Sequence, residues 1–174
     1  SLLKHMEIDS YSLFEQYIEE LTLGDTTQRE GHAAKVYFNA LMGSDFSRQD
    51  DNAINAALNY GYTILLSAIN REIVAQCYFT QLGLWHSNQF NPYNLASDLI
   101  EPLRGLIDSW VVSTDFENFS KNEKLEILSL LNKEVIINGT KRVLSDAIGV
   151  YVRSVFQALT EEDVDLVNFI EYEL

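Results

Sequence analysis

Cysteine, proline and positively charged residues are scarce in this chain of 174 residues. It has one cysteine and two prolines, and its 12 Lys+Arg are outnumbered by 26 Asp+Glu, giving a formal net charge of -14. The lone Cys77 excludes an intramolecular disulfide and a zinc site built from several thiolates, which favours a reducing, cytoplasmic setting. The shortage of Lys and Arg argues against a freestanding nucleic-acid-binding protein, because phosphate contacts need clustered positive charge.

Long apolar runs are also missing. No stretch of about 18 apolar residues occurs, so we expect no membrane span, and charged residues near the amino terminus interrupt any run that could act as a signal peptide. Hydrophobic residues make up 47% of the chain, which excludes a disordered or collagen-like protein. Length and composition therefore predict one acidic globular domain and no particular function.

Apolar residues recur with helical spacing along most of the sequence. They predict helices over residues 14–24, 29–42, 54–80, 121–131 and 145–159, and an acidic terminal helix over residues 161–174. A further helix is expected to begin at Pro92, with Asn91 as its N-cap, and to kink at Pro102. Asn138-Gly139 predicts a β-hairpin over residues 134–144. The predicted fold class is all-α with one small β-hairpin.

Glu30 is the first polar residue that departs from this pattern. It shares a helix face with Tyr37 and Leu41, so it should point into the domain near the start of a helix. A carboxylate in that place is destabilising unless something compensates its charge. A partner arginine or the helix dipole is one explanation, and a functional role is another.

His86 and Glu101 are two further polar residues that could have a function. His86 lies in a loop just before a predicted helix, where a lone histidine is usually structural. Glu101 directly precedes Pro102 and comes three residues after Asp98, so both carboxylates share a helix face. Together with Arg104 they could equally form an ordinary solvated charge cluster.

Taken together, Glu30, His86 and Glu101 are two carboxylates and one imidazole from two helices and a loop. Such donors suit Mg²⁺ or Mn²⁺, with coordination positions left for water and phosphate oxygens. Two carboxylates about 4 Å apart repel by about 4 kcal/mol at an effective dielectric constant of about 20, and a divalent cation reverses that sign. Spacing alone does not show that the three residues converge.

Three stretches resemble, in order, the signatures of one protein family. They are residues 29–39 (REGHAAKVYFN), residues 54–62 (INAALNYGY) and residues 83–91 (GLWHSNQFN), the last continuing through residues 94–104 (NLASDLIEPLR) to Asp108. These stretches resemble the CRISPR-associated spacer-acquisition integrase, also called its acquisition endonuclease. The branch from type II CRISPR systems is the most similar, and three blocks in order are highly specific.

The resemblance implies a role for each candidate residue. Glu30 matches the family's first metal-ligand glutamate, His86 its metal-ligand histidine and Glu101 its second acidic ligand, while Asp98 matches a nearby acidic position that we expect to support the ligands. The implied activity is that of a DNA endonuclease and integrase in antiviral defence that depends on Mg²⁺ or Mn²⁺. It inserts new spacer DNA into a CRISPR array by 3′-OH transesterification.

The resemblance also implies partners and a domain organisation. The partners are prespacer and repeat DNA, a small acquisition partner protein and, in the full-length form, a second copy in a homodimer. The family has an N-terminal β-rich domain without a counterpart here, so we expect residues 1–174 to be its C-terminal helical catalytic domain. Five basic residues near the signatures could form only a modest groove for DNA: Arg29, Lys35, Arg48, Arg71 and Arg104.

A hypothesis of another class stays open. The net charge and the missing domain are compatible with a chemically silent interaction module that binds acquisition partners. A third hypothesis, an unrelated divalent-metal hydrolase, has no separate support in the sequence. Two further expectations concern single residues: His32 should face away from Glu30, and Cys77 should be buried within the long helix.

Overall fold

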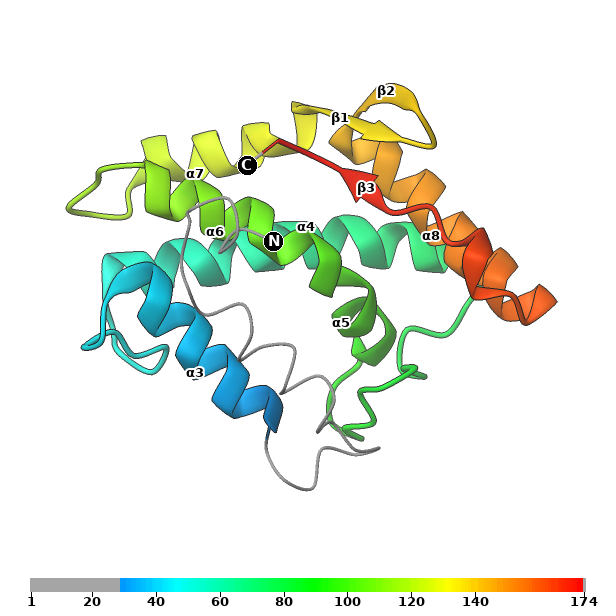
Figure 1. Ribbon diagram of the computed structural model, residues 1–174, viewed down its shortest axis with the longest axis horizontal. Coiled ribbons are helices and arrows are strands. Elements are labelled where there is room, and N and C mark those ends of the chain that lie inside the picture. The colour runs from blue at the N-terminus through cyan, green and yellow to red at the C-terminus, as the bar shows by residue number, and fades with distance from the viewer. Residues whose placement is uncertain (1–28, 174) are drawn as a thin grey trace.

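The computed structural model describes residues 29–173, in which helices surround one central helix and a small sheet lies at one edge (Figure 1). The helices are α3 (Arg29–Met42), α4 (Ala53–Ala75), α5 (Asn94–Ile100), α6 (Arg104–Ser113), α7 (Lys121–Ser129) and α8 (Leu144–Glu161). The predicted mostly helical class with a small β-hairpin is confirmed. The helix predicted over residues 14–24 lies outside the described residues.

Helix α4 is central because one broad face of it is apolar and buried, whereas the exposed face carries uncharged polar residues such as Asn59, Thr63 and Ser67. No charged residue occurs in it before Arg71, and α5, α6, α7 and α8 all pack against it. The side chain of Asn52 begins the helix by accepting a hydrogen bond from the N–H of Asn55 at 2.8 Å. Gly61 allows α6 to approach closely, because a Cβ atom there would lie 2.5 Å from Cγ2 of Ile107. The predicted central buried helix is therefore confirmed.

Helix α4 ends at Ala75, five residues before the predicted end. The N–H of Tyr78 donates to the carbonyl of Ile73 at 3.3 Å and the N–H of Cys77 to that of Val74 at 2.9 Å. Cys77 itself has a φ of 62° and is exposed, so the expectation that it is buried is wrong. Glycine is the usual residue in this terminating position, so a cysteine there gave no stop signal in the sequence.

Pro102 interrupts the next helical segment as predicted. Helix α5 ends at Ile100, a 3-10 turn, η1, follows over Glu101–Leu103, and α6 continues from Arg104. The carbonyl of Pro102 accepts a hydrogen bond at 2.9 Å from the hydroxyl of Tyr172, near the C-terminal end of the chain. Glu101 therefore lies at a break between two helices.

The small sheet has the order β2-β1-β3 and is antiparallel. Strands β1 (Glu134–Ile137) and β2 (Thr140–Val143) form the predicted hairpin, whose turn residues Asn138 and Gly139 both have positive φ angles. Strand β3 (Ile170–Glu171) pairs with β1 and follows a 3-10 turn, η3 (Val164–Leu166). The predicted acidic terminal helix is therefore wrong, because the chain leaves α8 at Glu161 and pairs with a strand remote in the sequence.

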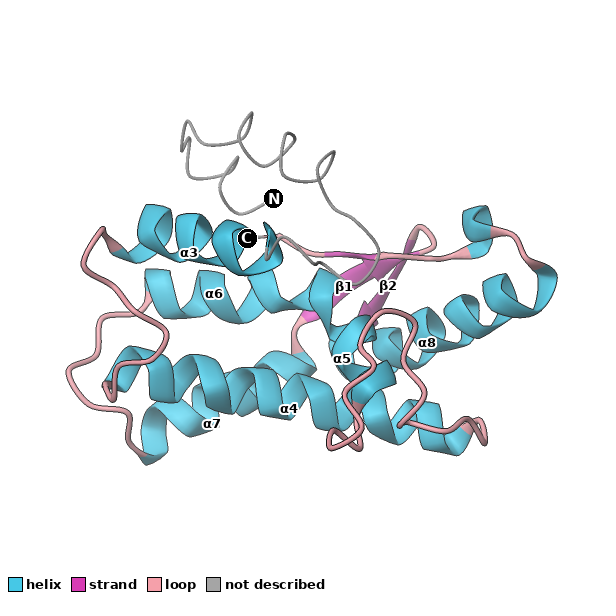
Figure 2. Ribbon diagram, turned by 90° about the horizontal axis from the view of Figure 1, so that it is seen from below, coloured by secondary structure: helices cyan, strands magenta, loops and turns pink. Residues whose placement is uncertain are grey.

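Helices α3 and α6 run in the same general direction (Figure 2), and the hydroxyl of Tyr37 on α3 donates a hydrogen bond to Asp108 on α6. In this view both begin near the middle of the molecule, on the side nearer α5. Phe38 and Met42 pack the C-terminal half of α3 against the core. No helix in the described part of the chain is long and apolar enough to cross a membrane.

Candidate metal centre

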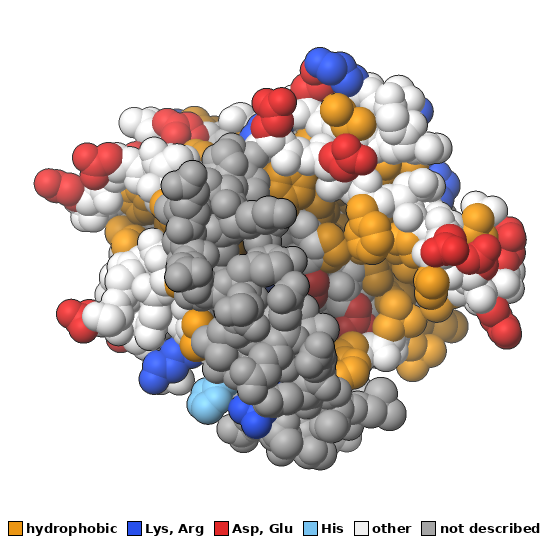
Figure 3. All heavy atoms as spheres, viewed as in Figure 1, with side chains coloured by type: hydrophobic (Ala, Val, Ile, Leu, Met, Phe, Trp, Pro, Cys, Tyr) orange, Lys and Arg blue, Asp and Glu red, His pale blue; other side chains and the backbone are white. Residues whose placement is uncertain are grey.

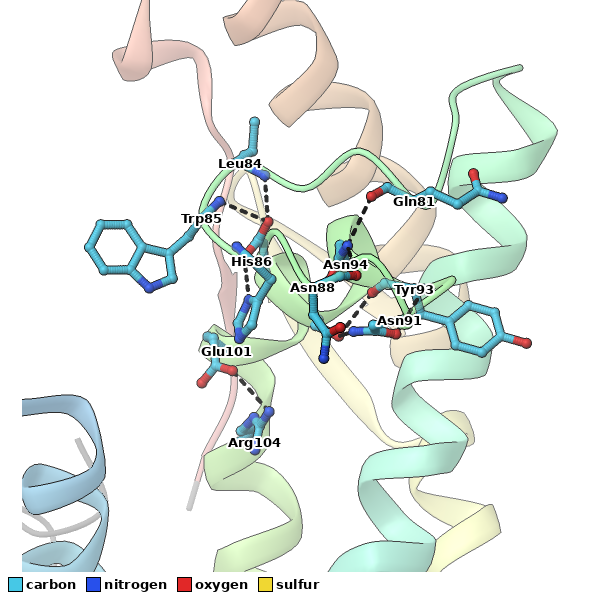
Figure 4. A network of polar contacts seen from close by, with 12 residues as sticks. Gln81, Leu84, Trp85, His86, Asn88, Asn91, Tyr93, Asn94, Glu101 and Arg104 are labelled. Carbon is cyan, nitrogen blue, oxygen red and sulfur yellow. Dashed lines mark hydrogen bonds and ion pairs between the residues drawn. The ribbon is translucent and has the colours of Figure 1, made fainter. Parts of the chain in front are cut away.

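Asp98 on α5 organises the loop that carries His86 (Figure 4). Its Oδ2 atom accepts hydrogen bonds from the N–H groups of Leu84 at 2.5 Å and Trp85 at 3.1 Å, and its Oδ1 atom accepts one from the N–H of His86 at 3.0 Å. The Asp98 side chain is only 7% exposed. One carboxylate thus fixes three successive peptide groups, which together form a small anion-binding concavity in the backbone.

The same carboxylate orients the imidazole of His86. The Nδ1 atom of His86 lies 2.5 Å from Oδ1 of Asp98. We assign the proton to Nδ1, because it faces a carboxylate, and this tautomer leaves the lone pair of Nε2 available to a ligand. In Figure 4 the ring points from the loop toward the start of η1, where Glu101 lies. A carboxylate bonded to the second ring nitrogen is what orients histidines that bind metals.

The donors around Asp98 keep it ionised. Burial alone would raise the pKa of Asp98, but the hydrogen bonds from the His86 ring and from three backbone N–H groups outweigh burial. The pKa of Asp98 is therefore lower than its ordinary value. A negative charge at Asp98 strengthens the hydrogen bond from Nδ1 and makes Nε2 a better electron-pair donor.

The shape of this loop requires a glycine at position 83. A Cβ atom on Gly83 would overlap the carbonyl oxygen of His86 and lie 2.8 Å from Oδ2 of Asp98. Asn94, which is 3% exposed, donates from its amide to two carbonyls of the loop at 3.0 and 2.9 Å. A cleft of about 260 Å³ opens beside His86. Steric crowding therefore explains why the third signature begins with Gly83.

The start of α5 differs from the prediction. Asn91, the expected N-cap, accepts a hydrogen bond from the N–H of Tyr93 at 2.9 Å, but the helix begins only at Asn94. The side chain of Asn91 thus stabilises a turn before the helix. The difference matters little for the site, because Asp98 lies within the helix in either case.

Glu101 has a different environment from Asp98, although one helical turn separates them. Its side chain is 47% exposed, and its Oε1 atom pairs with Nη2 of Arg104 at 2.9 Å. The expected charge cluster with Arg104 is therefore present for Glu101, whereas Asp98 is directed at the loop. A half-exposed carboxylate of this kind can exchange an arginine partner for a metal ion at modest cost.

The convergence of Glu30, His86 and Glu101 stays a prediction. Residue 30 belongs to α3, but its side chain lies outside the described part of the structure. Among the side chains that are described, no group of three or more His, Cys, Asp or Glu could hold a metal ion. His86 and Glu101 nevertheless fit a divalent cation chemically, because one offers an oriented imidazole nitrogen and the other a half-exposed carboxylate. His32 is exposed, and that it faces away from Glu30 stays a prediction.

A buried polar cluster beside these residues was not expected from the sequence. Asp108 on α6 is 2% exposed and accepts hydrogen bonds from the hydroxyls of Tyr37 on α3, at 2.6 Å, and Tyr62 on α4. Burial raises the pKa of Asp108, and the two tyrosines, Arg104 and Arg48 only partly offset that effect. The signal in the sequence was an aspartate in an otherwise apolar helix face.

Arg48, Arg71 and Arg104, all proposed for a groove, bind groups of the protein itself. Arg48 donates to the side-chain oxygens of Asn55 and, at 2.7 Å, Asn59. Arg71 pairs with Glu72 at 3.1 Å, and Arg104 pairs with Glu101. On the face shown in Figure 3, acidic side chains are spread around the periphery and hydrophobic side chains gather to the right of centre.

An aspartate-oriented histidine on a loop beside an exposed glutamate, within a helical domain, defines a candidate enzyme site. The family model for the CRISPR-associated protein Cas1 matches residues 8–129, which is most of the chain. The chain therefore belongs to the Cas1 family, and the family resemblance of its three signatures is confirmed.

Two relatives and one solved structure show how far the similarity extends. The CRISPR-associated endonuclease Cas1 of Neisseria meningitidis serogroup C (strain 8013) is 50% identical over 93 residues, which are 53% of this chain and 31% of the relative. The CRISPR-associated endonuclease Cas1 1 of Francisella tularensis subsp. novicida (strain U112) is 29% identical over 146 residues, 73% of this chain and 46% of the relative. The similarity to the Neisseria protein supports the type II branch.

The solved structure is described as "Casposase bound to integration product". It matches with a TM-score of 0.66 and 25% identity, over 82% of this chain and 52% of the casposase chain. The chain thus spans less than half the length of either Cas1 relative and about half of the casposase.

Proposed function

We propose that this chain carries the metal centre of a CRISPR spacer integrase and endonuclease, with Glu30, His86 and Glu101 as ligands of Mg²⁺ or Mn²⁺. The observation that carries the proposal is the geometry of His86, whose Nδ1 atom is bonded to the buried carboxylate of Asp98. The membership of this chain in the Cas1 family supports the same proposal, because two relatives are named as endonucleases.

Each residue has a separate task in this proposal. Asp98 fixes the orientation of the His86 ring before any cation binds. Binding of the cation to Nε2 therefore costs little further loss of rotational freedom. Glu101 and Glu30 contribute the oxygen ligands and balance the charge of the cation. Bound by these residues, the cation would supply Lewis-acid activation of a phosphodiester toward a 3′-OH group. The loop that carries His86 lies at the surface, with Trp85 42% exposed, so a DNA strand would have access to it.

DNA is the substrate class that the relatives support. The casposase was solved with an integration product, and strand transfer to a CRISPR repeat requires the same displacement at phosphorus. We further propose that the full-length protein forms a homodimer and binds a small acquisition partner protein, as the family resemblance implies. These assemblies would provide the phosphate contacts that an acidic chain with few available arginines provides poorly.

Nicking of supercoiled plasmid and joining of a labelled 3′-OH oligonucleotide, each with and without Mn²⁺, test the proposal. We expect Mn²⁺-dependent products from the chain and a loss of at least about 100-fold in Glu30→Gln, His86→Ala and Glu101→Gln. His32→Ala is the matched control, because it removes an exposed histidine from α3 and should leave the activity unchanged. Full activity in His86→Ala would overturn the assignment of His86.

The interaction module remains a second candidate because the loop around the site exposes large apolar side chains. Phe79, Leu82 and Phe90 are 72%, 70% and 84% exposed, respectively. Such side chains in one loop are typical of surfaces that bind a partner. A chain that produces no nicks at any Mn²⁺ concentration, together with a partner protein captured through this loop, would favour the module over the enzyme.

A further inference from the structure

Three helices meet at the carboxylate of Asp108. Tyr37 comes from α3, Tyr62 from α4 and Asp108 from α6, and each tyrosine hydroxyl donates to a different carboxylate oxygen. Asp108 is 2% exposed, so the cluster lies inside the protein. A buried carboxylate is a costly way to fill space, because a leucine of similar size would pack there without a desolvation penalty. Its hydrogen bonds, however, are directional and fix how the helices are rotated and shifted against one another.

The two bonded residues lie at the same separation along the sequence from the two expected carboxylate ligands. Tyr37 follows position 30 by seven residues, and Asp108 follows Glu101 by seven residues. Within α3, residues seven apart share a face and are separated by about 10 Å along the axis, whereas Glu101 lies in the 3-10 turn η1, which leads directly into α6. Because α3 and α6 run in the same general direction (Figure 2), the hydrogen bond between Tyr37 and Asp108 fixes where position 30 lies along α3 relative to Glu101, just before α6.

A second connection leads from the cluster to Glu101 itself. The guanidinium carbon of Arg104 lies 4.9 Å from the ring centre of Tyr62, and Nη2 of Arg104 is 2.9 Å from Oε1 of Glu101. Tyr62 is in turn bonded to Asp108. The cluster therefore contacts α3 through Tyr37 and the Glu101 side through Tyr62 and Arg104, so that it connects the two segments expected to contribute oxygen ligands.

We propose that Asp108 and Tyr37 are positioning residues, which lock α3 against α6 in the register that brings the carboxylates of Glu30 and Glu101 to one metal ion. This inference rests on the proposed function of the metal centre. It assigns the cluster no contact with substrate or metal. Its consequence is that loss of one hydroxyl about two helical turns from the metal centre weakens metal binding.

Tyr37→Phe is the most conservative test, because it removes one hydroxyl and leaves the ring. Ser154→Ala is the matched control: Ser154 is 4% exposed on α8, and its hydroxyl donates to the carbonyl of Tyr151 at 2.7 Å and accepts from the N–H of Asn168 at 2.9 Å. Both variants lose a buried hydroxyl that makes hydrogen bonds. Only Tyr37→Phe changes the attachment of α3.

Two measurements on the chain separate a positioning role from general loss of stability. Amide hydrogen exchange without metal should show about 5- to 10-fold faster exchange of the α3 amides in Tyr37→Phe and unchanged α3 exchange in Ser154→Ala. Calorimetric titration with Mn²⁺ alone should show a Kd raised about 5- to 10-fold in Tyr37→Phe and unchanged in Ser154→Ala. Asp108→Asn, which keeps one acceptor oxygen, should also raise the Kd.

The outcomes distinguish the inference from the proposed function. If Glu30→Gln leaves the Kd for Mn²⁺ unchanged, the proposed metal centre is wrong. If Glu30→Gln weakens binding while Tyr37→Phe and Asp108→Asn bind Mn²⁺ like the unaltered chain, the positioning role is wrong and the metal centre stands. Unchanged exchange of the α3 amides in Tyr37→Phe would independently overturn the claim that this hydroxyl locks the helix.

Discussion

Replacing Asp98 by alanine should destabilise the protein well beyond the average surface substitution. The change removes the acceptor of three backbone N–H bonds and of the Nδ1–H bond from His86. Leu84 and Trp85 are exposed, so their N–H groups regain water, and we take the lower end of about 0.5–1.5 kcal/mol for each backbone bond. The charged bond to His86 contributes about 1.5 kcal/mol. The expected loss is about 3 kcal/mol, or about 6–12 °C in Tm for a chain of this size.

Urea unfolding followed by tryptophan fluorescence measures this loss, because Trp85 lies in the affected loop and Trp110 lies in α6. Two further variants should lose less stability than Asp98→Ala. Asp98→Asn keeps one acceptor oxygen and should lose about half as much stability, and His86→Ala removes only the ring contact and should lose about 1.5 kcal/mol. A free energy of unfolding for Asp98→Ala within about 0.5 kcal/mol of the unaltered chain would refute the role given to this carboxylate.

Three further substitutions test other parts of the structure by the same unfolding measurement. The pKa of Asp108 is raised in the folded protein, so Asp108 binds a proton more tightly there than in the unfolded chain. The contribution of Asp108 to stability therefore falls as the pH rises from about 4 through the folded pKa. The stability of Asp108→Asn relative to the unaltered chain should therefore increase between about pH 4 and pH 7, and a constant difference would contradict this. Gly83→Ala should lose about 2 kcal/mol or more, because the new Cβ overlaps a backbone carbonyl. Cys77→Gly should gain about 0.5–1 kcal/mol at a φ of 62°, whereas Gln76→Gly, at a φ of -98°, should gain nothing.

Features that depend on nearby residues could be predicted from the sequence. The apolar surface of α4, the positive-φ pair Asn138-Gly139 and the break at Pro102 each follow from interactions within a few residues, and each is found where it was expected. The end of α4 was placed too late because the terminating residue is Cys77 rather than glycine. Propensity alone cannot show that a cysteine adopts a left-handed conformation.

Features that depend on remote partners could not be predicted. Strand β3 exists because Ile170 pairs with Ile137 in β1, and nothing in the acidic stretch around it indicates that partner. The same is true of Asp108, whose two tyrosine donors come from helices remote in the sequence. Local patterns give the periodicity of an element but not the identity of the side chains that meet across elements.

The candidate ligands came from the family resemblance, and their surroundings came from the structure. Spacing placed Asp98 and Glu101 on one helix face, but only the three-dimensional arrangement separates their roles. Asp98 is directed at the histidine loop, whereas Glu101 is half-exposed beside Arg104. That division of roles gives the metal-centre proposal its chemical content, since one carboxylate orients the imidazole and the other is accessible to a cation.

The position of Mn²⁺ in a crystal of this chain, located by its anomalous scattering, tests the central claim most directly. We expect one strong peak at bonding distance from Nε2 of His86 and from carboxylate oxygens of Glu101 and Glu30, with the hydrogen bond from Nδ1 to Asp98 retained. Crystals saturated with Mn²⁺ in which the ion is bound elsewhere, and the His86 ring has no metal neighbour, would contradict the account.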